Sequence, residues 1–254
     1  MNLKVINTQK EYDLYELLGL TWNFYTNNFF SLLNVALISY FLCNLFIITL
    51  PDVDIKGIFS FSGNDKGYLS FYLSTIFFVT SLSNLPIIVF TFHRLKNKDV
   101  DFVDTYKLTI AKFIKNILIN VGTIALFFTC FFIWVLFSLK WVSIFIVSAI
   151  PVVMMLLFFS FTVIAFASKE VNIWLSFAYS FRVAHSKWVK VLLYYIFIYF
   201  LSAIVSMAIS IPYTLFSRSL FTELIFNTIV NVFCSFFVIL MTFLFINLDN
   251  SIKK

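Results

Sequence analysis

Residues 224–247 read LIFNTIVNVFCSFFVILMTFLFIN, and this stretch decides the fold because it carries no charged side chain. An α-helix needs about 20 apolar residues to cross about 30 Å of hydrocarbon. Similar runs occupy residues 30–50, 68–92, 116–138, 141–167 and 189–211. Strands of a membrane barrel would instead alternate apolar and polar residues over about ten positions. The sequence therefore predicts an all-α polytopic membrane bundle of about six transmembrane helices, with residues 1–254 forming one membrane domain.

The composition agrees with a membrane protein. Apolar residues make up 61% of the chain and charged residues only 12%, whereas soluble domains contain about 25% charged residues. The net charge of +6 comes from basic residues in short loops between apolar runs, so it indicates topology and no nucleic-acid partner. Cys43, Cys130 and Cys234 all fall inside apolar runs without a CxxC pair, and we expect them to be packing residues.

The distribution of lysine and arginine predicts the orientation. The loop 93–115 carries six of them, the loop 168–190 carries four, and each terminus adds two. The three loops on the opposite side carry four in total. Because basic loops stay in the cytoplasm, we expect both termini and the two basic loops to be cytoplasmic.

A pattern of four residues precedes three of the predicted spans. It consists of a bulky apolar residue, a hydroxyl three positions later, an aromatic ring next, and another aromatic seven positions further on. The three copies are Leu18, Thr21, Trp22 and Phe29; Phe102, Thr105, Tyr106 and Phe113; and Phe177, Ser180, Phe181 and Trp188. Spacings of three and four place such residues on one helical face. The pattern predicts three interfacial amphipathic helices, within a threefold repeat of units 11–92, 93–167 and 168–254.

Three short segments resemble a known bacterial membrane domain. Residues 22–29 are similar to its "W-x-x-Y-x-x-N-F" opening, residues 173–188 to its "A-L-x-x-S-W … W" segment, and residues 245–249 (FINLD) to its closing "L-Y-Y-D-L-R". Asn250 stands where a basic residue usually follows the aspartate. The domain is the one attached to some glycerophosphodiester phosphodiesterases, and it also occurs alone. The resemblance implies a six-helix fold in a bacterial cytoplasmic membrane and carries over no enzyme activity.

The interiors of the predicted spans are polar only through uncharged groups. None has an acidic, basic or histidine side chain near its centre, which disfavours a proton-driven transporter. The polar candidates are Ser81, Ser83, Asn84, Asn227 and Asn231. Interhelical hydrogen bonds, worth about 0.6 kcal/mol each in membranes, are the favoured interpretation, and a polar lining for a headgroup or peptide is the alternative. His93 and His185 lack a third ligand at useful spacing, so we predict no metal, cofactor or catalytic site.

The basic loops supply the other candidate site. Lysine or arginine beside an anionic leaflet gains about 1 kcal/mol each, so lipid headgroups or a protein partner are the expected ligands. The residues concerned are Arg94, Lys96, Lys98, Lys112, Lys115, Arg182, Lys187 and Lys190.

Two functions follow from these features. The first is a non-catalytic membrane protein that associates with lipid or organises a membrane complex. The alternative is the permease subunit of an ABC-type exporter, since six spans, cytoplasmic termini and an amphipathic helix before the first span suit that class. A membrane-embedded enzyme ranks third.

Overall fold

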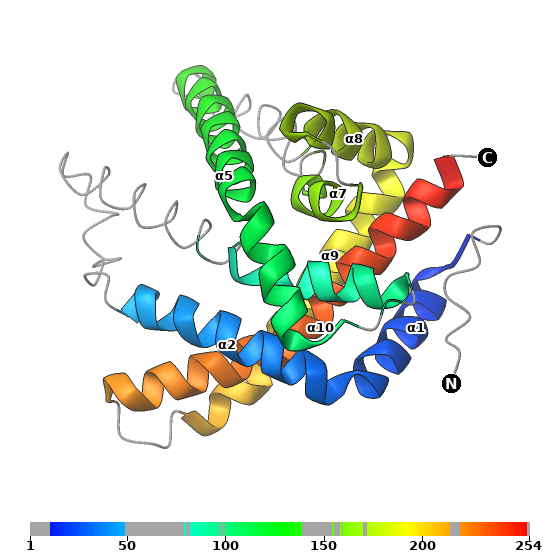
Figure 1. Ribbon diagram of the computed structural model, residues 1–254. Coiled ribbons are helices and arrows are strands. Elements are labelled where there is room, and N and C mark those ends of the chain that lie inside the picture. Colours follow the sequence, from blue (N-terminus) through cyan, green and yellow to red (C-terminus); the bar gives the residue numbers. More distant parts are fainter. Residues whose placement is uncertain are drawn as a thin grey trace.

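The computed structural model describes residues 11–48, 79, 82–96, 98, 100–138, 154, 158, 160–169, 172–213 and 219–252. Every regular element in these ranges is helical, as predicted (Figure 1). The helices are α1 (Leu14–Asn27), α2 (Phe29–Ile48), α5 (Phe102–Ser138), α7 (Thr162–Lys169), α8 (Ile173–Ser186), α9 (Trp188–Tyr213) and α10 (Leu220–Ile252), together with a helical segment at 82–95.

Helix α10 is the central element, and it contacts α1, α2, α7, α8 and α9 (Figure 1). Its apolar side chains are buried along its second half because neighbouring helices cover that part from several sides; they include Ile239, Leu240, Phe243, Leu244, Phe245 and Leu248. In a membrane, lipid tails are as apolar as these side chains, so close packing and interhelical hydrogen bonds hold such helices together. The end of α10 is the best-covered part of the described bundle.

Helices α1 and α2 run antiparallel to α10, one after the other. The ring of Phe24 in α1 lies 5.6 Å from that of Phe243, and the amide of Asn44 in α2 contacts Asn231. From Phe24 to Asn44 the residue numbers rise, while those of their partners in α10 fall from Phe243 to Asn231. Helix α9 is also antiparallel to α10. Ser206, in its second half, contacts Cys234, while Lys190, at its start, pairs with Glu11 next to Tyr12, which is bonded to Asn247 near the end of α10.

Three helices are long and apolar enough to cross a membrane within the part of the chain that is described. The candidate spans are Phe29–Ile47, Trp188–Ile211 and Leu220–Asn250. They correspond to the first, fifth and sixth predicted spans. The predicted span 68–92 is described at 79 and over 82–92, where it is helical, and most of the predicted span 141–167 lies outside the described residues.

The third predicted span, 116–138, lies inside the long helix α5, which begins at Phe102. Helix α5 continues without a break through Lys112 into Phe113, the last residue of the second copy of the pattern, so this copy has no separate interfacial helix. The other two copies do have a turn at the matching position. Asn28 ends α1, and its side-chain amide donates to the carbonyl of Phe24 at 2.9 Å. Lys187 separates α8 from α9, and its backbone angles (φ −139°, ψ 44°) are not helical.

The three hydroxyl positions of the sequence pattern share one environment. Thr21, Thr105 and Ser180 are all completely buried. Thr21 and Thr105 each donate to the backbone carbonyl four residues earlier, while Ser180 donates across to the carbonyl of Phe158 at 2.6 Å. A buried hydroxyl needs a hydrogen-bond acceptor, and each of these three has one. The threefold repeat itself stays a prediction.

Candidate functional site

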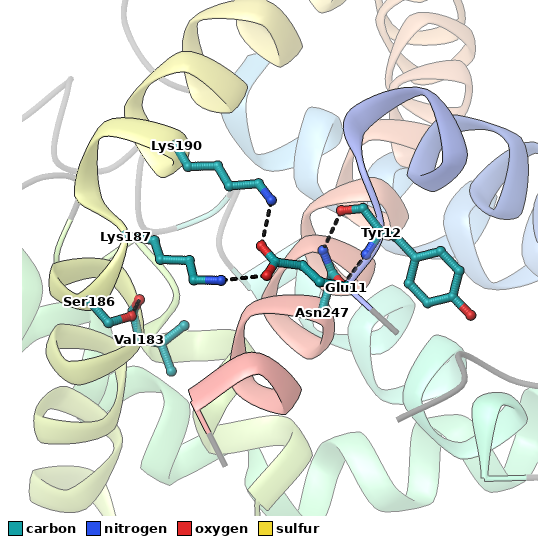
Figure 2. A network of polar contacts seen from close by, with 7 residues as sticks. All are labelled: Glu11, Tyr12, Val183, Ser186, Lys187, Lys190 and Asn247. Atoms are coloured by element: carbon teal, nitrogen blue, oxygen red, sulfur yellow. Dashed lines mark hydrogen bonds and ion pairs between the residues drawn. The ribbon is translucent and has the colours of Figure 1, made fainter. Parts of the chain in front are cut away.

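The main polar cluster lies around the end of α10 and the segment that precedes α1 (Figure 2). The side chain of Asn247 is buried in α10. The backbone N–H of Tyr12 donates to its Oδ1 at 3.0 Å, and its Nδ2 donates to the Tyr12 carbonyl at 2.9 Å. One side chain therefore satisfies both backbone groups of Tyr12, as a neighbouring strand would.

Two residues later, Asp249 joins three helices. Its carboxylate accepts hydrogen bonds from the ammonium group of Lys169, the last residue of α7, and from the hydroxyl of Tyr179 in α8. The same ammonium lies 5.2 Å from the centre of the Tyr179 ring. A buried carboxylate is costly unless it is paired and hydrogen-bonded, and here each oxygen has a donor. Burial and the neighbouring carboxylate of Asp249 raise the pKa of Tyr179.

The third contact of the cluster is an ion pair with two lysines. One carboxylate oxygen of Glu11 lies 2.6 Å from the ammonium of Lys187, and the other lies 2.6 Å from that of Lys190 (Figure 2). Hydrogen bonds from these two lysines lower the pKa of Glu11 from its ordinary value of 4.5 to about 2. Residues 11–13, which precede α1, are called the strap. Glu11 of the strap pairs with Lys187 and Lys190 at the start of α9, and Tyr12 bonds to Asn247 in α10.

Of the eight basic candidates, Lys187 and Lys190 are the pair that shares a partner. The ammonium of Lys112 donates to the carbonyl of Ala167 at 2.9 Å, near the end of α7. The helix dipole stabilises a positive charge at that end. Arg94 and Lys96 lie over the rings of Phe90 and Phe92, at 5.6 and 4.3 Å from the ring centres. Lys98, Lys115 and Arg182 are exposed. Apart from Lys187 and Lys190, the contacts described for these basic residues do not bring them together at one site.

The uncharged polar candidates divide into two interhelical contacts. The hydroxyl of Tyr40 donates to Oδ1 of Asn84 at 2.7 Å. Farther along α2, Asn44 accepts from Asn231 at 3.1 Å and donates to the hydroxyl of Thr228 at 3.2 Å. Ser83 is buried, Asn227 is half-buried, and Ser81 lies outside the described residues. Helices joined by such pairs match the favoured interpretation of interhelical hydrogen bonds.

Both histidines have local contacts. Nδ1 of His93 lies 2.9 Å from the carbonyl of Val89, one turn earlier. The ring of His185 stacks on Phe181 with centres 5.3 Å apart, beside a shallow depression of about 570 Å³ along α8. Within the described ranges, no three histidine, cysteine or acidic side chains group closely enough to hold a metal ion.

Sequence reasoning missed Glu11 and Asp249 as partners of the basic residues. The pairs are 176 residues apart for Glu11 and Lys187 and 80 residues apart for Lys169 and Asp249. Asp249 did carry a signal, because it is the acidic residue of the FINLD segment. Glu11 carried none beyond its charge.

Comparisons with family models, curated proteins and solved structures gave no match to this chain.

Proposed function

We propose that this chain is a multi-pass protein of the bacterial cytoplasmic membrane that acts without catalysing a reaction. It binds anionic lipid at its cytoplasmic face and organises a membrane complex there. Both termini and the two basic loops lie on that face. The bias of lysine and arginine between the loops supports this orientation.

The observation that carries the proposal is the pair of helices that lead into candidate spans. Helix α1 precedes α2, and its Trp22 is 60% exposed; helix α8 precedes α9, and its Trp174 is 82% exposed. Each helix buries its opposite face, which includes Leu17 and Val183. Helices with exposed aromatic side chains beside a membrane span are typical of the lipid–water interface.

Two further features support a role in lipid association. Lysine side chains at such helix ends attract anionic headgroups, and Lys187 stands at the turn from α8 to α9. The resemblance to the membrane domain of glycerophosphodiester phosphodiesterases also favours a protein of the lipid environment. The FINLD segment of that resemblance contains both Asn247 and Asp249.

The test is the lipid that accompanies the purified chain. The full-length protein is extracted in mild detergent, and its retained lipids are quantified by mass spectrometry beside those of the source membrane. We expect enrichment of anionic over zwitterionic lipid. Retained lipid with the same composition as the membrane would contradict the proposal.

The ABC permease is the second candidate, and the position of α1 before α2 favours it, since such permeases begin with an elbow helix. The same purification separates the two functions. A stoichiometric ATPase that co-purifies with the chain would replace the first proposal with the second, and its repeated absence would count against the permease.

A further inference from the structure

Lys187 and Lys190 are arranged around a single anionic group. They are three residues apart, so they lie on one face where α9 begins. Their ammonium nitrogens each lie 2.6 Å from a different oxygen of the Glu11 carboxylate (Figure 2). Two positive groups therefore converge on a space that holds one small oxyanion.

We expect this space to lie at the depth of the lipid phosphate groups. Candidate span Trp188–Ile211 begins between the two lysines, and the side chain of Trp188 is 41% exposed. Tryptophan and lysine at the end of a span both lie at headgroup depth. A phosphodiester carries one negative charge and two free oxygens, so it matches the carboxylate in charge and in number of acceptors.

Glu11 is held in this space by its neighbours in the chain. Tyr12 is bound through both backbone groups to Asn247. Asp13 caps α1, accepting from the N–H of Glu16 at 2.8 Å, while the Glu16 carboxylate accepts from the N–H of Asp13 at 3.2 Å. The strap thus positions Glu11 through contacts that do not involve the lysines.

We propose that Lys187 and Lys190 form a binding site for a phosphate group and that Glu11 occupies it as a built-in competitor. The proposal rests on the proposed lipid-binding function and adds its site and its regulation. A bound phosphate replaces the Glu11 carboxylate with a group of the same charge, and the strap keeps its contact between Tyr12 and Asn247. Exposed ion pairs are weak, so an incoming phosphate at membrane concentration displaces Glu11 readily.

Competition makes a sharp prediction for Glu11→Gln, which keeps the size of the side chain and removes its charge. Affinity for phosphatidylglycerol is measured by native mass spectrometry on the full-length protein in detergent. We expect Glu11→Gln to bind about five- to tenfold more tightly than the unmodified chain, because the lysines no longer hold an internal anion. A double replacement of Lys187 and Lys190 by Gln should weaken binding about tenfold or more.

Matched controls separate the site from general charge. Lys107 is an exposed lysine outside the set of candidate basic residues, with its ammonium 3.8 Å from the carboxylate of Asp104, and Lys107→Gln should leave the affinity within about twofold. Inorganic phosphate, added as a competitor, distinguishes the two sources of the phosphate group. Displacement of the lipid at millimolar phosphate assigns the site to free phosphate, and retention assigns it to the headgroup.

Asn247→Ala supplies a second test that changes no charge. It releases Tyr12 and so loosens Glu11, and it should tighten phosphatidylglycerol binding in the same direction as Glu11→Gln. If the lysine replacements weaken binding while Glu11→Gln and Asn247→Ala leave it unchanged, Glu11 is no competitor and this inference is overturned. If the unmodified chain shows no preference for phosphatidylglycerol over phosphatidylcholine, the proposed function itself fails.

Discussion

Asn247 holds both backbone polar groups of Tyr12, a residue 235 positions earlier in the chain. The contact brings the first described residues of the protein to the end of its central helix. It also places Glu11 beside the lysines at the start of α9. The segment before α1 and the last turns of α10 therefore lie together at one end of the described bundle.

Replacement of Asn247 by Ala should destabilise the protein by about 1–2 kcal/mol, because two hydrogen bonds are lost and the backbone of Tyr12 is left partly unpaired. Unfolding by sodium dodecyl sulfate in mixed micelles measures this change. Asn250→Ala, three residues later on the same helix, is the matched control and should cost less than about 0.5 kcal/mol. Equal costs for the two variants would show that the Tyr12 contact contributes no stability.

The pair of Lys169 and Asp249 should behave as a coupled unit. Asp249→Ala leaves the ammonium of Lys169 without its carboxylate and should cost about 3 kcal/mol. Lys169→Met should cost at least as much, about 3–4 kcal/mol, because it leaves the Asp249 carboxylate, only 6% exposed, without its lysine.

The double replacement tests the coupling directly. It should cost at least about 1 kcal/mol less than the sum of the two single changes, since no charge is then left unpaired. The same detergent unfolding assay applies. Costs that add without a difference would mean that the two side chains do not interact.

The ion pair of Glu11 should depend on pH in an acidic window. Its pKa in the folded protein is lowered from 4.5 to about 2, so the folded state favours the ionised carboxylate. The contribution is complete above pH 4.5 and is lost as the pH falls toward about 2. Because the pair is more than a third exposed at Glu11, we expect less than about 1 kcal/mol.

The measurement compares the unfolding of the unmodified chain with that of Glu11→Gln across this range. The difference between them should be constant from pH 7 to about pH 5 and should vanish near the lowered pKa of about 2. A difference that already disappears between pH 7 and pH 5 would contradict the ion pair with Lys187 and Lys190.

Asn231 and Asn227 offer a matched pair within one helix. Asn231 donates to Asn44 across the interface with α2, so Asn231→Leu should cost about 0.6 kcal/mol, the average for such bonds in membranes. Asn227 is half-buried, and Asn227→Leu should be neutral within error or slightly stabilising. A larger cost at Asn227 in detergent unfolding would indicate that the polar contact between the helices lies elsewhere.

The apolar runs of the sequence predicted the helical class and the positions of α2, α9 and α10. They did so because a span is defined by its own residues: length and hydropathy are local properties. The turn at Asn28 was also predictable, since asparagine can bond back to its own helix end. The continuation of α5 through Lys112 was not, because lysine neither favours nor prevents a turn and its ammonium instead binds the carbonyl of Ala167.

The candidate site was predictable only in part. The sequence selected Lys187 and Lys190 from their place beside a span, and the structure brings them together at Glu11. Partners that lie more than a hundred residues away leave no local pattern, so neither Glu11 nor the Tyr12 contact of Asn247 could be found from spacing. Such contacts depend on how the helices pack around α10 (Figures 1 and 2).

We propose that this chain crosses a membrane with its basic face in the cytoplasm, and site-specific labelling measures this orientation. Single cysteines are placed at Lys98 and at Ser219, both exposed, in a chain whose three native cysteines are replaced. Intact cells are treated with a membrane-impermeant maleimide. We predict that Ser219→Cys is labelled from outside and that Lys98→Cys is labelled only after the membrane is permeabilised. Equal labelling of both positions in intact cells would contradict this orientation.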